Sequence, residues 1–237
     1  MSPTIPRVPP PAEFQYVGSE LALFEKARSW KAYWRSVIAP FVHGAVLEAG
    51  AGIGANTRLL RELAHSRWTA LEPDAAMSAQ IEGADEVLAC TLGDLGDERR
   101  FDTILYIDVL EHIEDDRSEL RHAVAHLNDG GHIIVLSPAH NFLFTPFDSA
   151  IGHFRRYTRQ SLRQAAPREL ILRKLVYLDS AGMLASLGNR LLLRRSMPTE
   201  SQILTWNRLL VPLSRALDPF FAGRVGKSVL GVWSRQK

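Results

Sequence analysis

A glycine-rich stretch directly follows a short apolar run that carries one acid. Residues 46–57, VLEAGAGIGANT, place Gly50, Gly52 and Gly54 at alternate positions, starting two residues after Glu48. Glycine adopts positive φ angles and lets a ligand lie against the main chain. A bare turn of this kind between a strand and a helix is typical of a cofactor site, and the carboxylate favours a ligand with a cationic amino group.

A second acid lies at a spacing that suits a nucleoside. Glu72, in the run WTALEPD, comes 18 residues after Gly54, where a carboxylate accepts hydrogen bonds from a ribose diol. The letters GAGIGA also satisfy the G-x-G-x-x-G/A dinucleotide pattern through Gly50, Gly52 and Ala55. Two observations argue against NAD. The charge of Glu48 would repel a pyrophosphate, and no set of residues for hydride transfer follows in the sequence. The favoured ligand is therefore a nucleoside that bears an amino acid.

Two further groups of residues are candidate proton acceptors. Histidine titrates near neutral pH and suits the deprotonation of a hydroxyl. The run EHIEDD, residues 111–116, also contains oxygen and nitrogen ligands for a metal. We favour a helix that begins at 113–116 and runs to 127, because carboxylates complement the positive end of a helix dipole, and we predict no metal. The candidate bases are Asp108, Glu111 and His112 in the first group, and His140, Asp148, His153 and Tyr157 in the second.

The segment 138–162, PAHNFLFTPFDSAIGHFRRYTRQSL, combines charged and aromatic residues. We expect it to close an acceptor pocket and to supply the substrate-binding side chains. Arg155 and Arg156 would hold a carboxylate or phosphate through forked hydrogen bonds. The alternative is an internal ion pair with Asp148, next to a helix cap at Thr158. The predicted substrate-binding residues are His140, Asp148, His153, Arg155, Arg156 and Tyr157.

Strands alternate with helices along most of the chain. Strand-like runs occupy 45–50, 68–72, 86–92, 101–107 and 132–137, and helical runs occupy 56–66 and 117–131, the second ending on a glycine stop. Two further strands are predicted within 169–179 and 226–235. This order predicts an α/β fold with a doubly wound, mostly parallel sheet. The glycine turn then lies at the carboxyl ends of the strands, where such sheets bind ligands.

Segments outside this alternation complete the predicted organisation. Residues 1–18 are a proline-rich leader that we expect to be disordered, and 19–237 form a single domain. A helix over 19–42 would bury Leu21, Phe24, Trp30, Trp34 and Ile38 and stop at Pro40. Residues 181–225 form a helical insertion before the last strand, in which Pro212 divides an amphipathic run.

The insertion is basic. Residues 181–227 hold seven basic and two acidic side chains, a net charge of +5, whereas the whole chain carries +2. An amphipathic helix of this charge would cover the acceptor, form a dimer interface or lie on an anionic membrane. The alternative is a cap packed on its own domain with solvated arginines. The sequence does not predict an oligomeric state.

Composition limits the remaining possibilities. The 237 residues are 46% hydrophobic and 23% charged, so the chain can bury a large core, and its small net charge predicts no nucleic-acid partner. One cysteine, Cys90, excludes an internal disulfide framework and lies in a pattern typical of a buried strand. No segment has the length of apolar sequence that spans a membrane, and no secretion signal is found, so we expect a cytoplasmic protein.

Five motifs in order resemble the signatures of class I S-adenosylmethionine (SAM)-dependent methyltransferases. They are VLEAGAGIGANT, ALEPD, GDL, FDTILYIDVLEHIEDD and LNDGGHIIVLSPA, and they cover 45–139. The resemblance implies a Rossmann-like seven-stranded sheet whose last strand is antiparallel. It also implies that Glu48 and the glycines hold the methionine end of SAM, that Glu72 with Pro73 holds the ribose, that Asp94 and Leu95 flank the adenine, and that Ile107 and Asp108 lie near the methyl group.

The element D-x-x-x-G-H-x-R-R-Y, residues 148–157, resembles one found in a subset of bacterial class I methyltransferases, and it does not name an acceptor. An alternative for Asp94 is a turn cap. We predict methyl transfer from SAM to a small-molecule or lipid- or sugar-linked acceptor, at oxygen because His and Asp bases are present and an N-P-P-Y motif is absent. The catalytic candidates are His112, His153, Asp108 and Tyr157.

Two other classes of function remain open on the sequence alone. One is a nicotinamide-dependent oxidoreductase, which would bind NAD at the glycine turn. The other is a catalytically silent protein that binds SAM or associates with a membrane.

Overall fold

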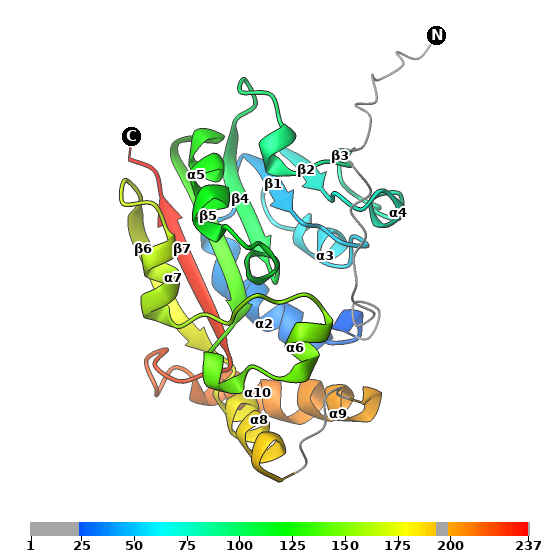
Figure 1. Ribbon diagram of the computed structural model, residues 1–237, viewed down its shortest axis with the longest axis vertical. Helices are drawn as coiled ribbons and strands as arrows, with labels where there is room; N and C mark the ends of the chain where they lie inside the picture. The colour runs from blue at the N-terminus through cyan, green and yellow to red at the C-terminus, as the bar shows by residue number, and fades with distance from the viewer. Residues whose placement is uncertain (1–23, 193–198, 237) are drawn as a thin grey trace.

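A mixed seven-stranded sheet forms the centre of the protein. The computed structural model describes residues 24–192 and 199–236 (Figure 1). The strand order is β3-β2-β1-β4-β5-β7-β6, in which only β7 runs antiparallel to its neighbours. This confirms the predicted Rossmann-like fold class. The strands are β1 (Ala45–Ala49), β2 (Arg67–Leu71), β3 (Glu86–Leu88), β4 (Phe101–Ile107), β5 (Leu127–Pro138), β6 (Ile171–Leu178) and β7 (Ser228–Ser234).

Helices cover both faces of the sheet and enclose two cores (Figure 1). Successive side chains of a strand point to opposite faces, so Ile104 and Tyr106 of β4 join one core, and Leu105 and Ile107 join the other. The first core packs against α5 (Asp116–Ala125) and α7 (Arg159–Ala165), and it includes Cys90, which is buried as predicted. The second core packs against α2 (Arg28–Ile38).

The N-terminal helix is shorter than predicted. Helix α2 begins at Arg28, because Ala27 has a ψ of 55° and so breaks the helical path. It buries Trp30, Trp34 and Ile38, as the spacing predicted, and a 3₁₀ turn (Ala39–Phe41) that contains the predicted stop follows it. Residues 19–23 of the predicted helix and the whole predicted leader, 1–18, lie outside the described residues.

Two helical predictions were wrong in their extent. The helix predicted over 56–66 spans only Thr57–Leu60 (α3), and the run predicted to end on a glycine stop ends at Ala125, before β5. Gly130 and Gly131 instead lie within β5, near a shift of register against β4. A Cβ at Gly131 would lie 3.0 Å from the carbonyl oxygen of Asp102, so the glycines permit close pairing of two strands. The strand predicted over 86–92 also ends early, at Leu88.

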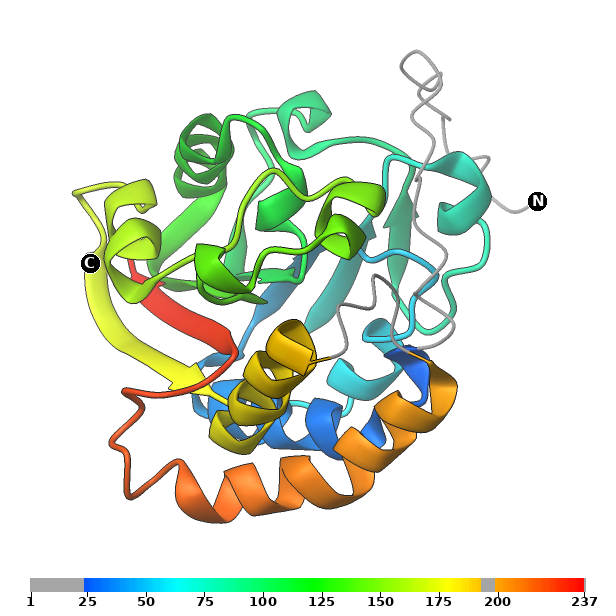
Figure 2. The same cartoon turned by 60° about the horizontal axis from the view of Figure 1, so that its bottom comes forward.

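The insertion before β7 is helical, as predicted. It consists of α8 (Ser180–Leu192), α9 (Glu200–Thr205), a π-helical segment (Trp206–Leu210) and α10 (Val211–Leu217). The last three follow one another without a break and form an arc beside α2 (Figure 2). Pro212 lies in the first turn of α10, directly after the π-helical segment, which is how the chain accommodates a proline within a continuous helix. None of the described helices is long and apolar enough to cross a bilayer.

A buried carboxylate, Asp179, ties this insertion to the sheet. Asp179 lies between β6 and α8, is fully buried and has a φ of 68°. Its Oδ1 accepts hydrogen bonds from the Gly182 amide at 3.1 Å and the Ser214 hydroxyl at 2.6 Å. Its Oδ2 accepts one from Trp206 Nε1 at 2.7 Å and lies 3.5 Å from Lys227 Nζ. One side chain therefore connects α8, the π-helical segment, α10 and the start of β7.

A second buried carboxylate extends the connection to α2. Asp218 accepts hydrogen bonds from the Tyr33 hydroxyl at 2.8 Å and from the backbone amides of Asp179 and Ser180 at 2.8 and 3.1 Å. Removing one member of a buried charged network leaves the others desolvated and unpaired. The two aspartates therefore make the insertion part of the folded unit.

We predict that Asp179→Ala lowers the free energy of unfolding by about 3–5 kcal/mol, because it leaves Lys227, Trp206 and Ser214 without their shared acceptor. Asp179→Asn retains hydrogen-bond acceptors and tolerates the positive φ, so its loss should be smaller. Chemical denaturation followed by circular dichroism measures both.

The matched control is Asp129→Ala, which removes an exposed carboxylate from a surface pair with Arg235 and should change stability by less than about 0.5 kcal/mol. Equal losses for Asp179→Ala and Asp129→Ala would contradict the role assigned to Asp179.

Candidate active site

The site lies where the strand order reverses. The chain continues from β1 to β2 on one side and places β4 on the other, which is the position where doubly wound sheets bind ligands. A cavity of about 270 Å³ opens at the carboxyl ends of these strands. Its walls include Gly50 and Gly52 from the turn after β1, and Ile107 and Asp108 from the end of β4. The predicted glycine turn and the predicted strand-four residues therefore meet in one cavity.

The glycine turn requires its glycines. Gly50, Gly52 and Gly54 have φ angles of 64°, 60° and 74°, a region that side chains disfavour. A Cβ on Gly50 would lie 2.7 Å from the side chain of Val109, and one on Gly54 would lie 3.1 Å from Ile81 Cα. The turn thus brings bare backbone to the cavity wall, as a cradle for a ligand would.

Glu72 supports the glycine turn from the end of β2. Its Oε2 accepts a hydrogen bond from the Gly52 amide at 2.8 Å, and its Oε1 accepts one from the Asp74 amide at 3.0 Å. Burial raises its pKa, while the two backbone hydrogen bonds oppose this. Glu72 is only 5% exposed, and neither it nor Pro73 is among the residues that line the cavity, so the structure shows Glu72 as a support of the turn. Pro73 lies between Glu72 and Asp74 in the chain.

Glu48 lies behind the turn. It is 3% exposed, and its Oε2 accepts hydrogen bonds from Thr57 Oγ1 at 2.8 Å and Trp68 Nε1 at 2.9 Å. It is not among the residues that line the cavity, so the structure does not place it against a ligand's amino group. Burial raises its pKa to about 7, although both hydrogen bonds and the charge of Lys31 oppose the rise. The carboxylate fixes the start of α3 relative to β1 and β2.

The cavity wall offers a different acceptor for a cationic group. Asn56 lines the cavity, and its Oδ1 is buried without a hydrogen-bond partner among the described residues. A buried carbonyl oxygen without a donor is unfavourable, and a ligand ammonium would satisfy it. The positive-φ turn and this oxygen are groups that would fit the amino-acid end of SAM.

The predicted adenine residues form a turn near the end of β3. Asp94 Oδ2 accepts hydrogen bonds from the Thr91 amide at 2.9 Å and the Thr91 hydroxyl at 2.6 Å. This is the turn cap considered as the alternative in the sequence. These two hydrogen bonds lower the pKa of Asp94. Neither Asp94 nor Leu95 lines the cavity.

Acidic and imidazole side chains face the glycine turn across the cavity. Asp108 ends β4 with a φ of 56° and is open to the cavity. The surrounding protein desolvates it and raises its pKa to about 6, while the charge of His153 opposes the rise. Glu111 and His112 follow in a 3₁₀ turn (Leu110–His112), and the ring of His112 lies 4.5 Å from that of His153. Burial lowers the pKa of His112 to about 4.

Asp148 holds His153 and Arg156 in place. His153 Nδ1 lies 2.9 Å from Asp148 Oδ1, and Arg156 contacts both carboxylate oxygens, at 2.8 and 3.0 Å. Although burial alone would raise the pKa of Asp148, the hydrogen bonds from His153 and Arg156 and the charge of Arg156 hold it well below its usual range. Arg156 is thus committed to the internal ion pair that the sequence offered as an alternative, and Thr158 caps α7 as that alternative also stated.

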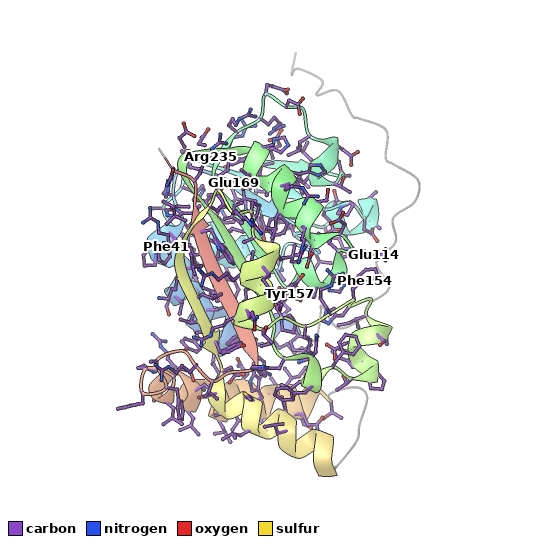
Figure 3. All side chains as sticks on the ribbon, turned by 60° about the vertical axis from the view of Figure 1, so that its left-hand side comes forward. Phe41, Glu114, Phe154, Tyr157, Glu169 and Arg235 are labelled. Carbon is purple, nitrogen blue, oxygen red and sulfur yellow. The ribbon has the colours of Figure 1, made fainter. Side chains whose placement is uncertain are left out.

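The other predicted substrate residues lie outside the cavity. Tyr157 (Figure 3) is 2% exposed and donates a hydrogen bond to Asp116 at 2.6 Å. Arg155 pairs with the same carboxylate at 2.8 Å. His140 has a φ of 67°, and its Nε2 lies 3.1 Å from the carbonyl oxygen of Gly226. The structure thus brings Asp148, His153 and Arg156 together at the cavity. It places Tyr157, Arg155 and His140 away from the cavity.

Two lysines and several aromatic residues of the wall were not among the predicted site residues. Lys227 Nζ lies 3.8 Å from the centre of the Trp206 ring, and burial lowers its pKa. Lys31, from α2, donates a hydrogen bond to the carbonyl oxygen of Ala55 at 3.3 Å. The antiparallel direction of the last strand was the one available indication, because it places the residue before β7 at the carboxyl ends of the other strands. The aromatic wall residues are Phe24, Trp30, Trp34, Phe147 and Trp206.

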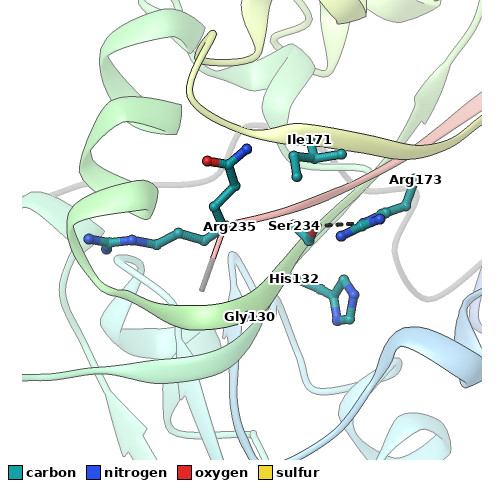
Figure 4. Close-up of a pocket in the computed structure, with 7 residues that line it drawn as sticks. Gly130, His132, Ile171, Arg173, Ser234 and Arg235 are labelled. Carbon is teal, nitrogen blue, oxygen red and sulfur yellow. Dashed lines mark hydrogen bonds between the residues drawn. The ribbon is translucent and has the colours of Figure 1, made fainter.

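A second, more open cavity lies at the opposite ends of the strands. It measures about 390 Å³ and lies among residues of β5, β6 and β7 (Figure 4). Arg173 Nε donates a hydrogen bond to Ser234 Oγ at 2.7 Å there, beside His132. No residue of the glycine turn or of the acidic cluster lines this cavity, so we place the chemistry in the first one.

Known proteins share this architecture. A SAM-dependent methyltransferase from Clostridium acetobutylicum ATCC 824 is 13% identical, with 92% of this chain and 96% of that chain aligned at a TM-score of 0.56. N-methyltransferase NodS from Bradyrhizobium japonicum WM9 is 15% identical over 92% and 99%, at 0.55. Phosphoethanolamine N-methyltransferase 2 from Haemonchus contortus is 12% identical over 92% of this chain and 58% of that chain, at 0.60. At these identities the likeness shows the fold. None of the curated proteins matches the sequence.

The family is shown by the sequence itself. Residues 22–169, more than half of the chain, match the family model described as a methyltransferase domain, and the chain belongs to that family. The protein is therefore an enzyme of the methyltransferase class, as predicted. NodS was also solved with S-adenosylhomocysteine (SAH), and the Haemonchus enzyme with SAM.

We predict that Glu48 makes the stability of the ligand-free protein depend on pH. Because its folded pKa of about 7 exceeds the ordinary value of 4.5, the native state binds the extra proton between these values, and the free energy of unfolding falls as pH rises through this window. The loss is about 3 kcal/mol when complete. Glu48→Gln keeps an acceptor for Thr57 and Trp68 and should remove this part of the slope between pH 5 and pH 8 in urea denaturation.

The control is Glu62→Gln, which changes an exposed glutamate paired with Arg35 and should follow the wild-type pH dependence. A Glu48→Gln slope identical to that of wild type would contradict the prediction.

Proposed function

We propose that the protein transfers a methyl group from SAM to an oxygen of a small-molecule or lipid- or sugar-linked acceptor. The observation that supports this most is the cavity, in which a bare glycine turn faces a cluster of carboxylate and imidazole groups. The turn suits the cofactor, and the cluster suits an acceptor whose proton must be removed.

The residues of the chain position and enclose the reactants. SAM supplies an activated methyl group on a sulfonium, so the protein needs no covalent nucleophile. Gly50, Gly52 and Asn56 would hold its amino-acid end and Glu72 its ribose. Trp30, Trp34 and Trp206 line the same cavity and exclude water, which favours direct displacement between aligned partners.

Asp108 is the proposed general base. It is the acidic side chain that opens to the cavity directly after β4, and its pKa is raised toward the range in which a carboxylate removes a proton effectively. The acceptor oxygen forms its bond to the methyl carbon as the bond from that carbon to sulfur breaks, and the hydroxyl proton passes to Asp108. His112 and His153 line the acceptor side of the cavity beside it.

Two lysines in the wall favour an acceptor that carries a negative charge. Lys31 and Lys227 line the cavity, while Arg156 is already paired with Asp148. A ligand phosphate or carboxylate would find a cationic partner in Lys31 and would share Lys227 with Asp179, whose carboxylate lies 3.5 Å from its ammonium group. One similar structure, the Haemonchus enzyme, was solved with phosphomonomethylethanolamine. Because that enzyme and NodS are N-methyltransferases, nitrogen is the alternative acceptor atom.

We predict that the wild-type protein binds SAH and not NAD in calorimetric titrations, and that Asp108→Asn lowers kcat about 10²–10⁴-fold for a hydroxyl acceptor. Tandem mass spectrometry of the methylated product identifies the atom. SAH affinity should remain within about tenfold of wild type in Asp108→Asn, because the lost step is proton removal.

The control is Asp129→Asn, because Asp129 lies on the surface outside the cavity and its exchange should leave kcat unchanged. Failure to bind SAH, or binding of NAD in its place, would overturn the proposed function. Methylation at nitrogen with full activity of Asp108→Asn would overturn the oxygen assignment.

The outer face of the insertion favours an acceptor held in a membrane. Leu209, Leu213, Phe220 and Phe221 are exposed there, and Phe220 is 83% exposed. Three arginines of the same segments are also exposed, and the nearby acid Asp218 is buried. Apolar side chains flanked by cations bind anionic lipid surfaces. The inner face of the same helices supplies Trp206 to the cavity, so a lipid-linked acceptor would approach along this layer. The arginines are Arg208, Arg215 and Arg224.

We predict that the protein co-sediments with vesicles that contain anionic lipid at low salt, and that the double variant Phe220→Ser, Leu213→Ser weakens this binding about tenfold or more, since both side chains would leave the apolar phase. Phe154→Ser is the matched control, because Phe154 is also exposed but lies away from the insertion (Figure 3). Protein that stays in the supernatant, or equal losses for both variants, would rule out this surface.

A further inference from the structure

Three potential metal ligands converge on the acceptor side of the cavity. Glu111 and His112 come from the 3₁₀ turn after β4, and His153 comes from the loop after α6 (Pro146–Ala150). A ligand atom from each residue lies within 4.8 Å of the others. All three residues line the cavity. Two segments that are 41 residues apart, from His112 to His153, thus bring two imidazoles and one carboxylate together.

Each end of the group is held from behind. Asp148 contacts His153 at Nδ1, which directs Nε2 toward Glu111 Oε1, 3.9 Å away. Ser137 donates a hydrogen bond to Glu111 Oε2 at 2.8 Å and so fixes the carboxylate. A carboxylate behind a histidine and a hydrogen bond behind a ligating carboxylate are the supports that orient the ligands of metal sites in proteins.

One oxygen of the Glu111 carboxylate, Oε1, lacks a hydrogen-bond donor in the part of the chain that the structure describes. The side chain of Glu111 is fully buried. A buried carboxylate oxygen without a donor or cation is strongly unfavourable. In the buried carboxylates of Asp179 and Asp148, by contrast, both oxygens have donors. Glu111 Oε1 is therefore arranged for a cationic ligand that approaches from the cavity.

We propose that Glu111, His112 and His153 bind one divalent transition-metal ion that leaves coordination positions open to the methyl acceptor. Two imidazoles with one carboxylate favour an ion of the Mn²⁺ to Zn²⁺ series over Mg²⁺ or Ca²⁺, which prefer oxygen ligands. Ligand atoms that lie about 2 Å from one metal ion lie about 3–4 Å from one another. Side-chain rotations that move the ligand atoms by about 1 Å would therefore bring all three within coordination distance of one ion.

This inference rests on the proposed function for its role but not for its test. An acceptor oxygen bound to the ion would lose its proton more readily, because a metal stabilises the resulting oxyanion. Asp108, three residues before Glu111, would receive that proton. The ion would thus orient the acceptor, and the glycine turn would orient the cofactor.

Metal binding can be measured without SAM or acceptor. Full-length protein freed of metal by a chelator is titrated with Zn²⁺ by calorimetry and with Co²⁺ by visible absorption, which reports nitrogen ligands through its d–d bands. We expect one ion per chain. Glu111→Gln retains the hydrogen bond with Ser137 and should weaken Zn²⁺ binding about 100-fold. Loss of a residue that only supports a ligand weakens metal binding about 10–100-fold in other proteins, so loss of a ligand itself should have at least the larger effect. His112→Gln serves as a second ligand variant if Glu111→Gln fails to fold.

A histidine pair elsewhere supplies the matched control. His132 lines the second cavity (Figure 4), and its Nδ1 lies 3.2 Å from His43 Nε2. Such a pair can take up Zn²⁺ adventitiously. His132→Gln should leave the main binding event intact. Loss of binding in His132→Gln with retention in Glu111→Gln, or no uptake of either ion at 1 mM (of the order of the weakest specific binding), overturns the metal site.

SAH binding separates the two proposals. Wild type that binds SAH but no metal retains the proposed function and loses the metal site. Protein that binds one ion through Glu111 but neither binds SAH nor methylates any acceptor retains the metal site and loses the proposed function. Melting temperature and SAH affinity of Glu111→Gln, both close to wild type, exclude misfolding as the cause of weaker metal binding.

Discussion

The parallel pairing of β1 with β4 is the constraint on which the site depends. Adjacent parallel strands end at the same edge of a sheet, so Gly50 and Asp108 emerge side by side although 58 residues separate them in the sequence. The chain leaves β1 toward β2 on the other side, which keeps the connection from covering this edge. The glycine turn and the acidic cluster face each other for this reason, and α2 and the insertion only close the space between them.

Buried carboxylates carry much of the remaining organisation. Glu48, Asp148, Asp179 and Asp218 are almost inaccessible to solvent, and each accepts hydrogen bonds from separate segments of the chain. Buried charges are tolerated when such donors surround them, and they then specify which segments meet. Asp148 lines the cavity, and Asp179 contacts the wall residues Trp206 and Lys227, so groups that define the fold also fix the positions of residues in the cavity wall.

The sequence predicted what depends on local pattern and missed what depends on distant partners. Apolar runs predicted the strands and their mostly parallel direction, and the glycine turn predicted the cofactor. The glycines at 130 and 131 resembled a helix stop, but pairing with β4 determined their conformation. Whether Glu48 met a ligand, or Arg156 an acceptor, depended on Thr57, Trp68 and Asp148 as alternative partners, and spacing does not show which partner a side chain reaches. Lys227 belonged to no motif.

The π-helical segment has a consequence for how the cavity wall is built. A turn that holds one more residue than an α-turn shifts the phase of everything beyond it by about 100°. The segment itself is fixed at its start, where Trp206 donates a hydrogen bond to Asp179 and Asn207 Oδ1 accepts one from the Trp30 amide in the first turn of α2 at 3.1 Å. The extra residue in this one turn therefore sets the rotation of α10 about its own axis. It determines which surface of α10 faces the domain and which surface faces outward.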